Sequence, residues 1–127
     1  MGQPNLDEAR RLYSALRDIV IHHHGGWADY ESLGKMRKLV NAALAAVDDV
    51  ECHQHLESAA EHSAEVFSEN GHKKWDRSYM TGVDFLRLRI LRELDAFHSR
   101  LFALEAMARA AAKSSTNGSS ASEPRYS

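Results

Sequence analysis

The sequence of 127 residues has little of what interrupts or cross-links a helix: one cysteine, two prolines and seven glycines. The single cysteine, Cys52, excludes an internal disulfide and gives no indication of an oxidising compartment. Few prolines and glycines leave long stretches without a helix breaker, and alanine and leucine are abundant. The composition therefore favours an all-α fold, and the length fits a single domain.

Other features are absent as well. No long hydrophobic run occurs, and the N-terminal residues lack the apolar segment of a signal peptide, so neither a membrane span nor secretion is predicted. The cytoplasm is therefore the default location. The sequence also contains no glycine-rich phosphate loop, nucleophile elbow or CxxC pair. These absences predict a protein that is not an enzyme and that holds no cofactor.

The net charge of −2 hides an uneven distribution. Residues 1–70 contain six Lys and Arg against twelve Asp and Glu, whereas residues 71–127 contain ten against six. An acidic helix beside a basic helix in one fold explains this division. Nucleic-acid binding by the basic side of the last helix is an alternative. However, its basic residues alternate with acidic ones, so they form no continuous stripe for phosphates.

Two helices are predicted in the first third of the chain. The first runs over residues 5–24, with Asn5 as N-cap, Glu8 completing a capping box and a Gly-Gly pair after the helix. The second begins at Asp29 as N-cap. Apolar side chains recur in both at the spacing of one helical face. We expect these faces to contain Ala9, Leu12, Tyr13, Leu16, Ile19, Val20 and His23 in the first helix, and Tyr30, Leu33, Met36, Val40, Ala43, Leu44 and Val47 in the second.

A break is predicted near Asp48, although residues 35–70 contain no glycine or proline. Asp48 and Glu51 have the spacing of a capping box. The apolar face also changes phase after Val47 by roughly a third of a turn, at about 100° per residue. One continuous, kinked helix is the alternative. Beyond the break, the predicted buried face contains Cys52, Leu56, Ala59, Ser63, Val66 and Phe67.

The last helix is predicted over residues 76–113, much longer than the others. Its core face has a nearly strict heptad spacing: Val83, Leu86, Ile90, Leu94, Phe97, Leu101, Leu104 and Ala108. Leu88, Leu91, Phe102 and Ala106 cover a second face. The serine-rich residues 114–127 are too polar to order themselves and are predicted to be a disordered tail. The sequence thus predicts one domain, residues 1–113, folded as an antiparallel bundle of four helices.

The second face of the last helix leads to a functional hypothesis. This helix is apolar over more of its circumference than one core requires. Either the second and third helices cover the excess from end to end, or another subunit or a protein partner covers it. The sequence therefore predicts a non-enzymatic interaction or regulatory module that self-associates through Leu88, Leu91, Phe102 and Ala106.

The stretch ECHQHLESAAEH at residues 51–62 suggests an alternative, a metal-binding bundle. Helical bundles bind metals through inward-pointing histidines and carboxylates from neighbouring helices. On a helical wheel, however, the three histidines of this stretch lie beside the buried face, and its glutamates point outward. A specific site would need a further ligand from the last helix. The candidate ligands are His53, His55, His62 and His98.

The run from His55 to Ala60 is similar to the segment around the phosphorylated histidine of phosphotransfer (HPt) domains, which are also helical bundles. In that motif the phosphorylated histidine stands two residues before the leucine, and this sequence has Gln54 there. The lysine that usually follows the leucine is replaced by Glu57. Because the reactive residue is missing, the resemblance implies the bundle but not the activity.

Overall fold

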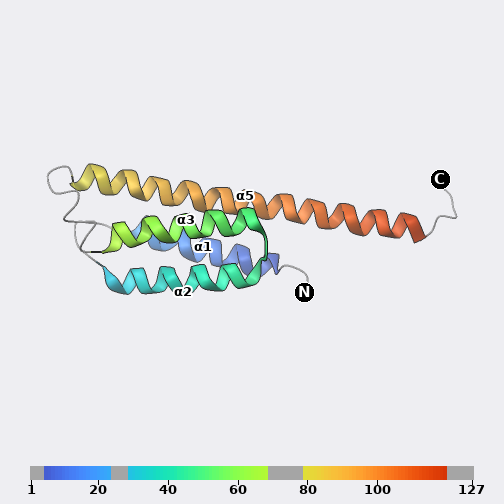
Figure 1. Cartoon of the computed structure of the whole chain (residues 1–127), viewed down its shortest axis with the longest axis horizontal. Coiled ribbons are helices and arrows are strands. Elements are labelled where there is room, and N and C mark those ends of the chain that lie inside the picture. The colour runs from blue at the N-terminus through green and yellow to red at the C-terminus, as the bar shows by residue number, and fades with distance from the viewer. Residues whose placement is uncertain (1–4, 24–28, 69–78, 120–127) are drawn as a thin grey trace.

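The computed structural model describes residues 5–23, 29–68 and 79–119, with side chains for residues 5–23, 29–68 and 85–113. In these ranges the chain forms four helices and no strand (Figure 1). The helices are α1 (Leu6–His22), α2 (Tyr30–Ala46), α3 (Val50–Phe67) and α5 (Tyr79–Ser119). The predicted all-α helical bundle is confirmed. None of the described helices combines the length and hydrophobicity needed to cross a membrane.

Hydrogen bonds between helix ends show that neighbouring helices run in opposite directions. The Asn5 N–H, at the start of α1, donates to the carbonyl of Ala46 at the end of α2, at 2.9 Å. The Asp29 N–H, at the start of α2, donates to the carbonyl of Phe67 at the end of α3, at 2.8 Å. Each helix packs against two neighbours, in the cyclic order α1, α2, α3, α5. The α1–α2 and α2–α3 pairs are therefore antiparallel.

Each of the three shorter helices begins at a side-chain cap. The carboxamide of Asn5 accepts from the Glu8 N–H at 3.1 Å, and the carboxylate of Asp29 accepts from the Ser32 N–H at 3.0 Å. Both caps were predicted from the sequence. The capping box at Asn5 forms only in part, because the Glu8 side chain instead pairs with Arg11. These caps satisfy N–H groups that have no partner within the helix.

The predicted break near Asp48 separates two distinct helices, not two parts of one kinked helix. Val47 has extended backbone angles, and α3 begins at Val50. The cap of α3 is Asp49, one residue later than predicted, and its carboxylate accepts from the Cys52 N–H at 3.0 Å. Asp48 is exposed, whereas Asp49 also contacts an arginine of α5. That tertiary contact distinguishes the two aspartates, and the local pattern does not contain it.

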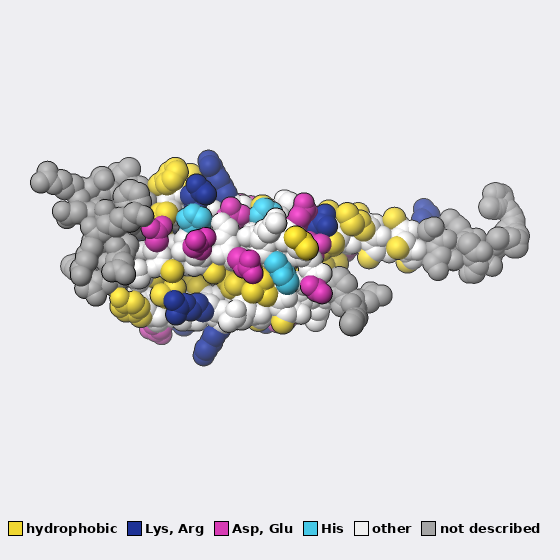
Figure 2. Space-filling view, viewed as in Figure 1, with side chains coloured by type: hydrophobic (Ala, Val, Ile, Leu, Met, Phe, Trp, Pro, Cys, Tyr) yellow, Lys and Arg dark blue, Asp and Glu magenta, His cyan; other side chains and the backbone are white. Residues whose placement is uncertain are grey.

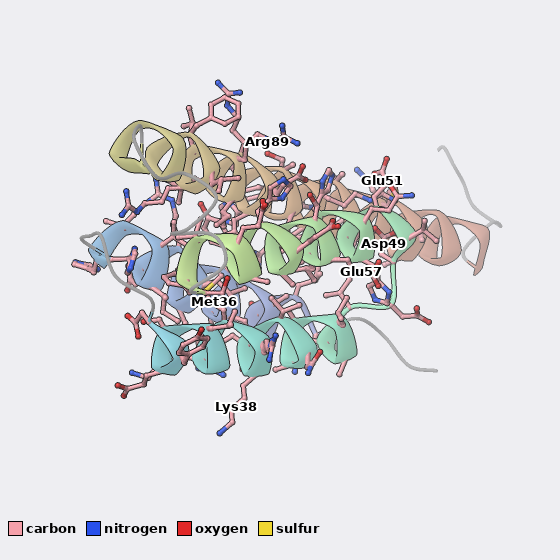
Figure 3. All side chains as sticks on the ribbon, turned by 60° about the vertical axis from the view of Figure 1, so that its left-hand side comes forward. Met36, Lys38, Asp49, Glu51, Glu57 and Arg89 are labelled. Carbon is pink, nitrogen blue, oxygen red and sulfur yellow. The ribbon has the colours of Figure 1, made fainter. Side chains whose placement is uncertain are left out.

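The core lies between the four helices. Most residues of the predicted stripes are buried: Ala9, Leu12, Leu16 and Val20 from α1; Leu33, Met36, Val40 and Ala43 from α2, with Val47; Cys52, Leu56, Ala59, Ser63, Val66 and Phe67 from α3; and Leu86, Ile90, Leu94, Phe97 and Leu101 from α5. Figure 3 shows Met36 pointing toward the other helices and Lys38 pointing away. Tyr30 and Ala108 were predicted in the buried faces but are exposed. Tyr30 is the first residue of α2, and Ala108 lies in the part of α5 that the other helices do not cover.

The last helix is longer than the other three. It contains 41 residues and spans about 60 Å, whereas 17- or 18-residue helices span about 26 Å. Figure 1 shows α5 continuing past the common end of α1, α2 and α3. The helix reaches Ser119, so the first six residues of the predicted tail are helical. Residues 120–127, the predicted start near Asp76 and the side chain of Val83 lie outside the described parts.

Candidate functional site

The two faces of α5 have different environments within the bundle. Its inner face, from Leu86 to Leu101, is buried in the core. The opposite face carries four large apolar side chains that are about half exposed: Phe85 at 54%, Leu88 at 44%, Phe102 at 55% and Met107 at 53%. A helix in a monomeric bundle needs only one apolar face. The outer face of α5, defined by these four residues, is therefore the candidate functional site.

The sequence predicted part of this outer face. Leu88, Phe102 and Ala106 are exposed on it, as self-association would require. Leu91 is half-buried and packs against the core, so it contributes less surface than predicted. Phe85 and Met107 were missed. Each stands within one helical turn of a predicted residue, which was the signal available in the sequence.

Phe102 has contacts with two polar neighbours. Its ring meets the His98 imidazole edge to face, with centroids 5.0 Å apart, and the Arg10 guanidinium lies 5.5 Å from the ring centroid. His98 also stacks on Tyr13 at 4.2 Å. These contacts hold Phe102 in place at the boundary between α1 and α5. Its exposed half is a preformed apolar surface.

Two arginines lie among the apolar residues at the beginning of the outer face. Arg89 and Arg92 are exposed, and no described carboxylate forms an ion pair with either of them. Other arginines of this helix do have partners. Arg100 binds Asp49 in a bidentate pair, with both distances 3.0 Å, and also lies 3.0 Å from Glu51. Arg89 and Arg92 thus give the first part of the outer face an unneutralised positive charge.

The outward face of α3 carries the opposite charge. Glu57 and Glu61 are exposed and, within the described residues, have no basic partner. Figure 2 shows acidic side chains gathered over α3, while basic and apolar side chains stand at the free edge of α5. A hydrogen bond of 2.8 Å from His55 Nδ1 to the Glu93 carboxylate joins α3 to α5. One surface of the molecule therefore presents a negative and a positive strip side by side.

The four candidate metal ligands contact different partners. His53 Nε2 donates to the carbonyls of Val47 at 2.8 Å and Leu44 at 3.1 Å, and His62 Nδ1 donates to the carbonyl of Ser58 at 2.8 Å. His55 binds a glutamate of α5, and His98 faces α1. The described residues contain no group of three or more side chains placed to hold a metal ion. The structure thus does not bring the predicted ligands together.

His53 has a structural role instead. The two carbonyls that it binds belong to the last turn and C-cap of α2 and have no partner within that helix. An imidazole N–H from the first turn of α3 therefore caps α2 across the three-residue connection. His62 similarly binds the carbonyl one turn earlier in its own helix. Hydrogen bonding of this kind explains why polar side chains stand beside the buried face.

Cys52 is not arranged as a nucleophile. Its side chain is fully buried, and this burial, with the neighbouring Asp49 carboxylate, raises the pKa of the thiol to about 12. A thiol with so high a pKa stays protonated at neutral pH, and the thiolate is the reactive form. Cys52 therefore serves as a small core residue.

A shallow cleft of about 470 Å³ lies between α2 and α3. Its walls are formed by Tyr30, Leu33, Arg37, Ala64, Glu65 and Ser68. No histidine or cysteine lines it, and its charged groups are the single Arg37 and Glu65.

Comparison of the chain with models of known protein families, with curated proteins and with solved structures found no match. The function must therefore be inferred from the surface of the molecule itself.

Proposed function

We propose that this chain is a non-enzymatic helical interaction module that associates with a second copy through the outer face of α5. The observation that carries the proposal is the exposure of Phe85, Leu88, Phe102 and Met107 on one long helix, part of which extends past the bundle. Large apolar side chains that stay exposed on one element are typical of protein contact sites. Contacts with another chain would remove it from water.

The extension of α5 supports the same proposal. Every described side chain from Ala106 to Lys113 is exposed, so no part of the bundle covers this segment. An isolated helix of about 12–15 residues is only marginally stable in water, even when rich in alanine. The spacing of Leu104, Ala108 and Ala111 nevertheless continues the core stripe. Packing against another helix would stabilise the extension.

A second copy is the partner that the charge distribution favours. The acidic balance of residues 1–70 and the basic balance of residues 71–127 give one chain both of the complementary charges. Complementary potentials across an interface promote association and set its register. The charges of two copies can therefore complement each other without a third component.

Sedimentation velocity over a hundredfold concentration range tests this proposal. We expect a concentration-dependent shift from monomer to a larger species. The double variant Leu88→Gln, Met107→Gln should weaken association by roughly tenfold or more, because each substitution removes apolar surface from the contact. Ile21→Gln is the matched control, since Ile21 is 42% exposed but lies on α1.

The control variant should associate like the native chain. A native chain that stays monomeric at every concentration would contradict the proposal. An equal loss of association in Ile21→Gln would show that general surface hydrophobicity, not the outer face of α5, causes the contact.

A further inference from the structure

We infer that the outer face of α5 docks on the acidic face of α3 in the second copy, with Arg89 and Arg92 meeting Glu57 and Glu61. The inference rests on the proposed self-association and names the surface that receives α5. It differs from a symmetric contact of α5 with α5, which would place the arginines of both copies together.

The positive partner is a short, well-defined strip. Arg89 and Arg92 are three residues apart, so they lie about one turn from each other on the same side of α5. Both are exposed, and no described carboxylate binds either of them. The exposed Phe85 and Leu88 lie beside them. An apolar contact flanked by two guanidinium groups therefore requires an acidic receiving surface.

The negative partner has the same dimensions. Glu57 and Glu61 are four residues apart, again about one turn, and both are exposed without a basic partner among the described residues. Like charges at this spacing repel each other on a helix by a few tenths of a kcal/mol. Two arginines at one-turn spacing would neutralise both glutamates at once. Because the two arginines and the two glutamates are each spaced by about one helical turn, both ion pairs can form at the same time.

Within one copy, no described ion pair joins Arg89 or Arg92 to Glu57 or Glu61. Figure 3 shows Arg89 on α5 and Glu57 on α3, at separate places on the molecule. Where α3 and α5 meet, His55 already pairs with Glu93. Neutralisation therefore requires a second molecule.

A dimer with a two-fold axis would pair the positive strip of each copy with the negative strip of the other. Because α3 and α5 are neighbours, one two-fold axis at their shared surface puts each α5 on the partner's α3. Such an interface is isologous, and it closes at the dimer. A dimer with two such contacts contains four interchain Arg–Glu pairs. Because these pairs are solvent-exposed, each should contribute little alone, and their sum should fall with added salt.

A charge-reversal experiment tests the inference. One full-length variant carries Arg89→Glu and Arg92→Glu, and a second carries Glu57→Arg and Glu61→Arg. In low salt we expect each variant alone to associate roughly tenfold more weakly than the native chain, because opposite charges become like charges. An equimolar mixture of the two should recover most of the native association, because the reversed strips again complement each other.

The control reverses Arg37 and Lys38 on α2, which are exposed and have no described acidic partner either. This variant should associate like the native chain. Circular dichroism and melting of every variant report the fold, which exposed substitutions should leave almost unchanged.

The outcomes separate this inference from the proposed function. Native self-association that survives both reversals, or that the mixture does not restore, would overturn docking on α3 while leaving self-association in place. A monomeric native chain would overturn both and would point to a different acidic partner for Arg89 and Arg92.

Discussion

The two parts of α5 are the same helix in different surroundings. Residues 85–105 present five fully or almost fully buried side chains to the core, whereas every described side chain from 106 to 113 is exposed. The heptad spacing continues through both parts, from Leu94 and Leu101 to Ala108. The first part is stabilised by packing, and the alanine-rich second part by helix propensity. Burial and helix formation are thus separate properties of one element.

The largest expected difference between the two parts is the cost of removing a side chain. Leu94 is fully buried, so Leu94→Ala should lower the free energy of unfolding by about 2–5 kcal/mol through lost burial and a cavity. Met107 is 53% exposed, and Met107→Ala should change it by less than about 0.5 kcal/mol. Urea denaturation of the monomer at low protein concentration measures both. Equal losses would show that the extension is packed within one chain.

A second difference is the ion pair that attaches the first part to α3. Hydrogen bonds from Arg100 lower the pKa of Asp49 from 3.8 to about 2. This stabilisation is complete above about pH 4 and is lost as the pH falls toward 2. Asp49→Asn keeps an N-cap side chain but removes the charge, so it should cost about 2 kcal/mol at pH 7.

Urea denaturation at pH 7 and at pH 2 checks this expectation. The difference between Asp49→Asn and the native chain should shrink at the lower pH, where the native carboxylate becomes protonated. Asp48→Asn is the control and should have little effect, because Asp48 is exposed and does not contact Arg100. A pH-independent cost for Asp49→Asn would attribute its role to capping and not to charge.

Glycine substitutions in the two parts of α5 should also have different effects. Ala96 lies within the bundle, so Ala96→Gly should lower the global free energy of unfolding by about 1 kcal/mol. Ala110 is exposed in the extension, and Ala110→Gly should loosen only the local helix. Hydrogen exchange should show faster exchange around residue 110 with an unchanged denaturation midpoint for the monomer. A shifted midpoint would instead couple the extension to the core.

The smallest effect is expected at the boundary between the two parts. Arg10 on α1 pairs with Glu105 and lies over the ring of Phe102. Both partners of the ion pair are partly exposed, so Arg10→Gln should cost less than about 1 kcal/mol. Thermal melting in low and high salt measures this cost, which salt should reduce. A cost insensitive to salt would indicate packing of the arginine stem.

Local patterns predicted much of the fold. Asn5 and Asp29 were identified as caps because each has a side-chain oxygen directly before an apolar repeat. Such an oxygen can accept a hydrogen bond from the free N–H groups at a helix start. The break after Val47 followed from the change of phase. The choice of Asp49 over Asp48 could not be predicted, because it depends on Arg100, which is far away in the sequence.

The residue of α5 at which burial in the bundle ends could not be predicted from the sequence either. Leu104 and Ala108 belong to one unbroken repeat, yet only the former packs against the core. Where burial stops is decided by the ends of α1, α2 and α3, not by α5 itself. For the candidate site, the wheel placed Leu88 and Phe102 outside correctly, but it could not reveal which arginines find carboxylates on other helices.

The cyclic order of the helices also bears on the order of folding. Three of the four helix pairs join helices that are consecutive among the described ones, and each can form as a local hairpin. The pair α1 and α5 instead joins the two ends, as in the hydrogen bond of 2.7 Å between Tyr13 and Asp95, 82 residues apart. Such a distant contact has the highest loop-closure cost unless the hairpins have already shortened the path. We therefore expect the seam between α1 and α5 to close last, after the three hairpins have formed.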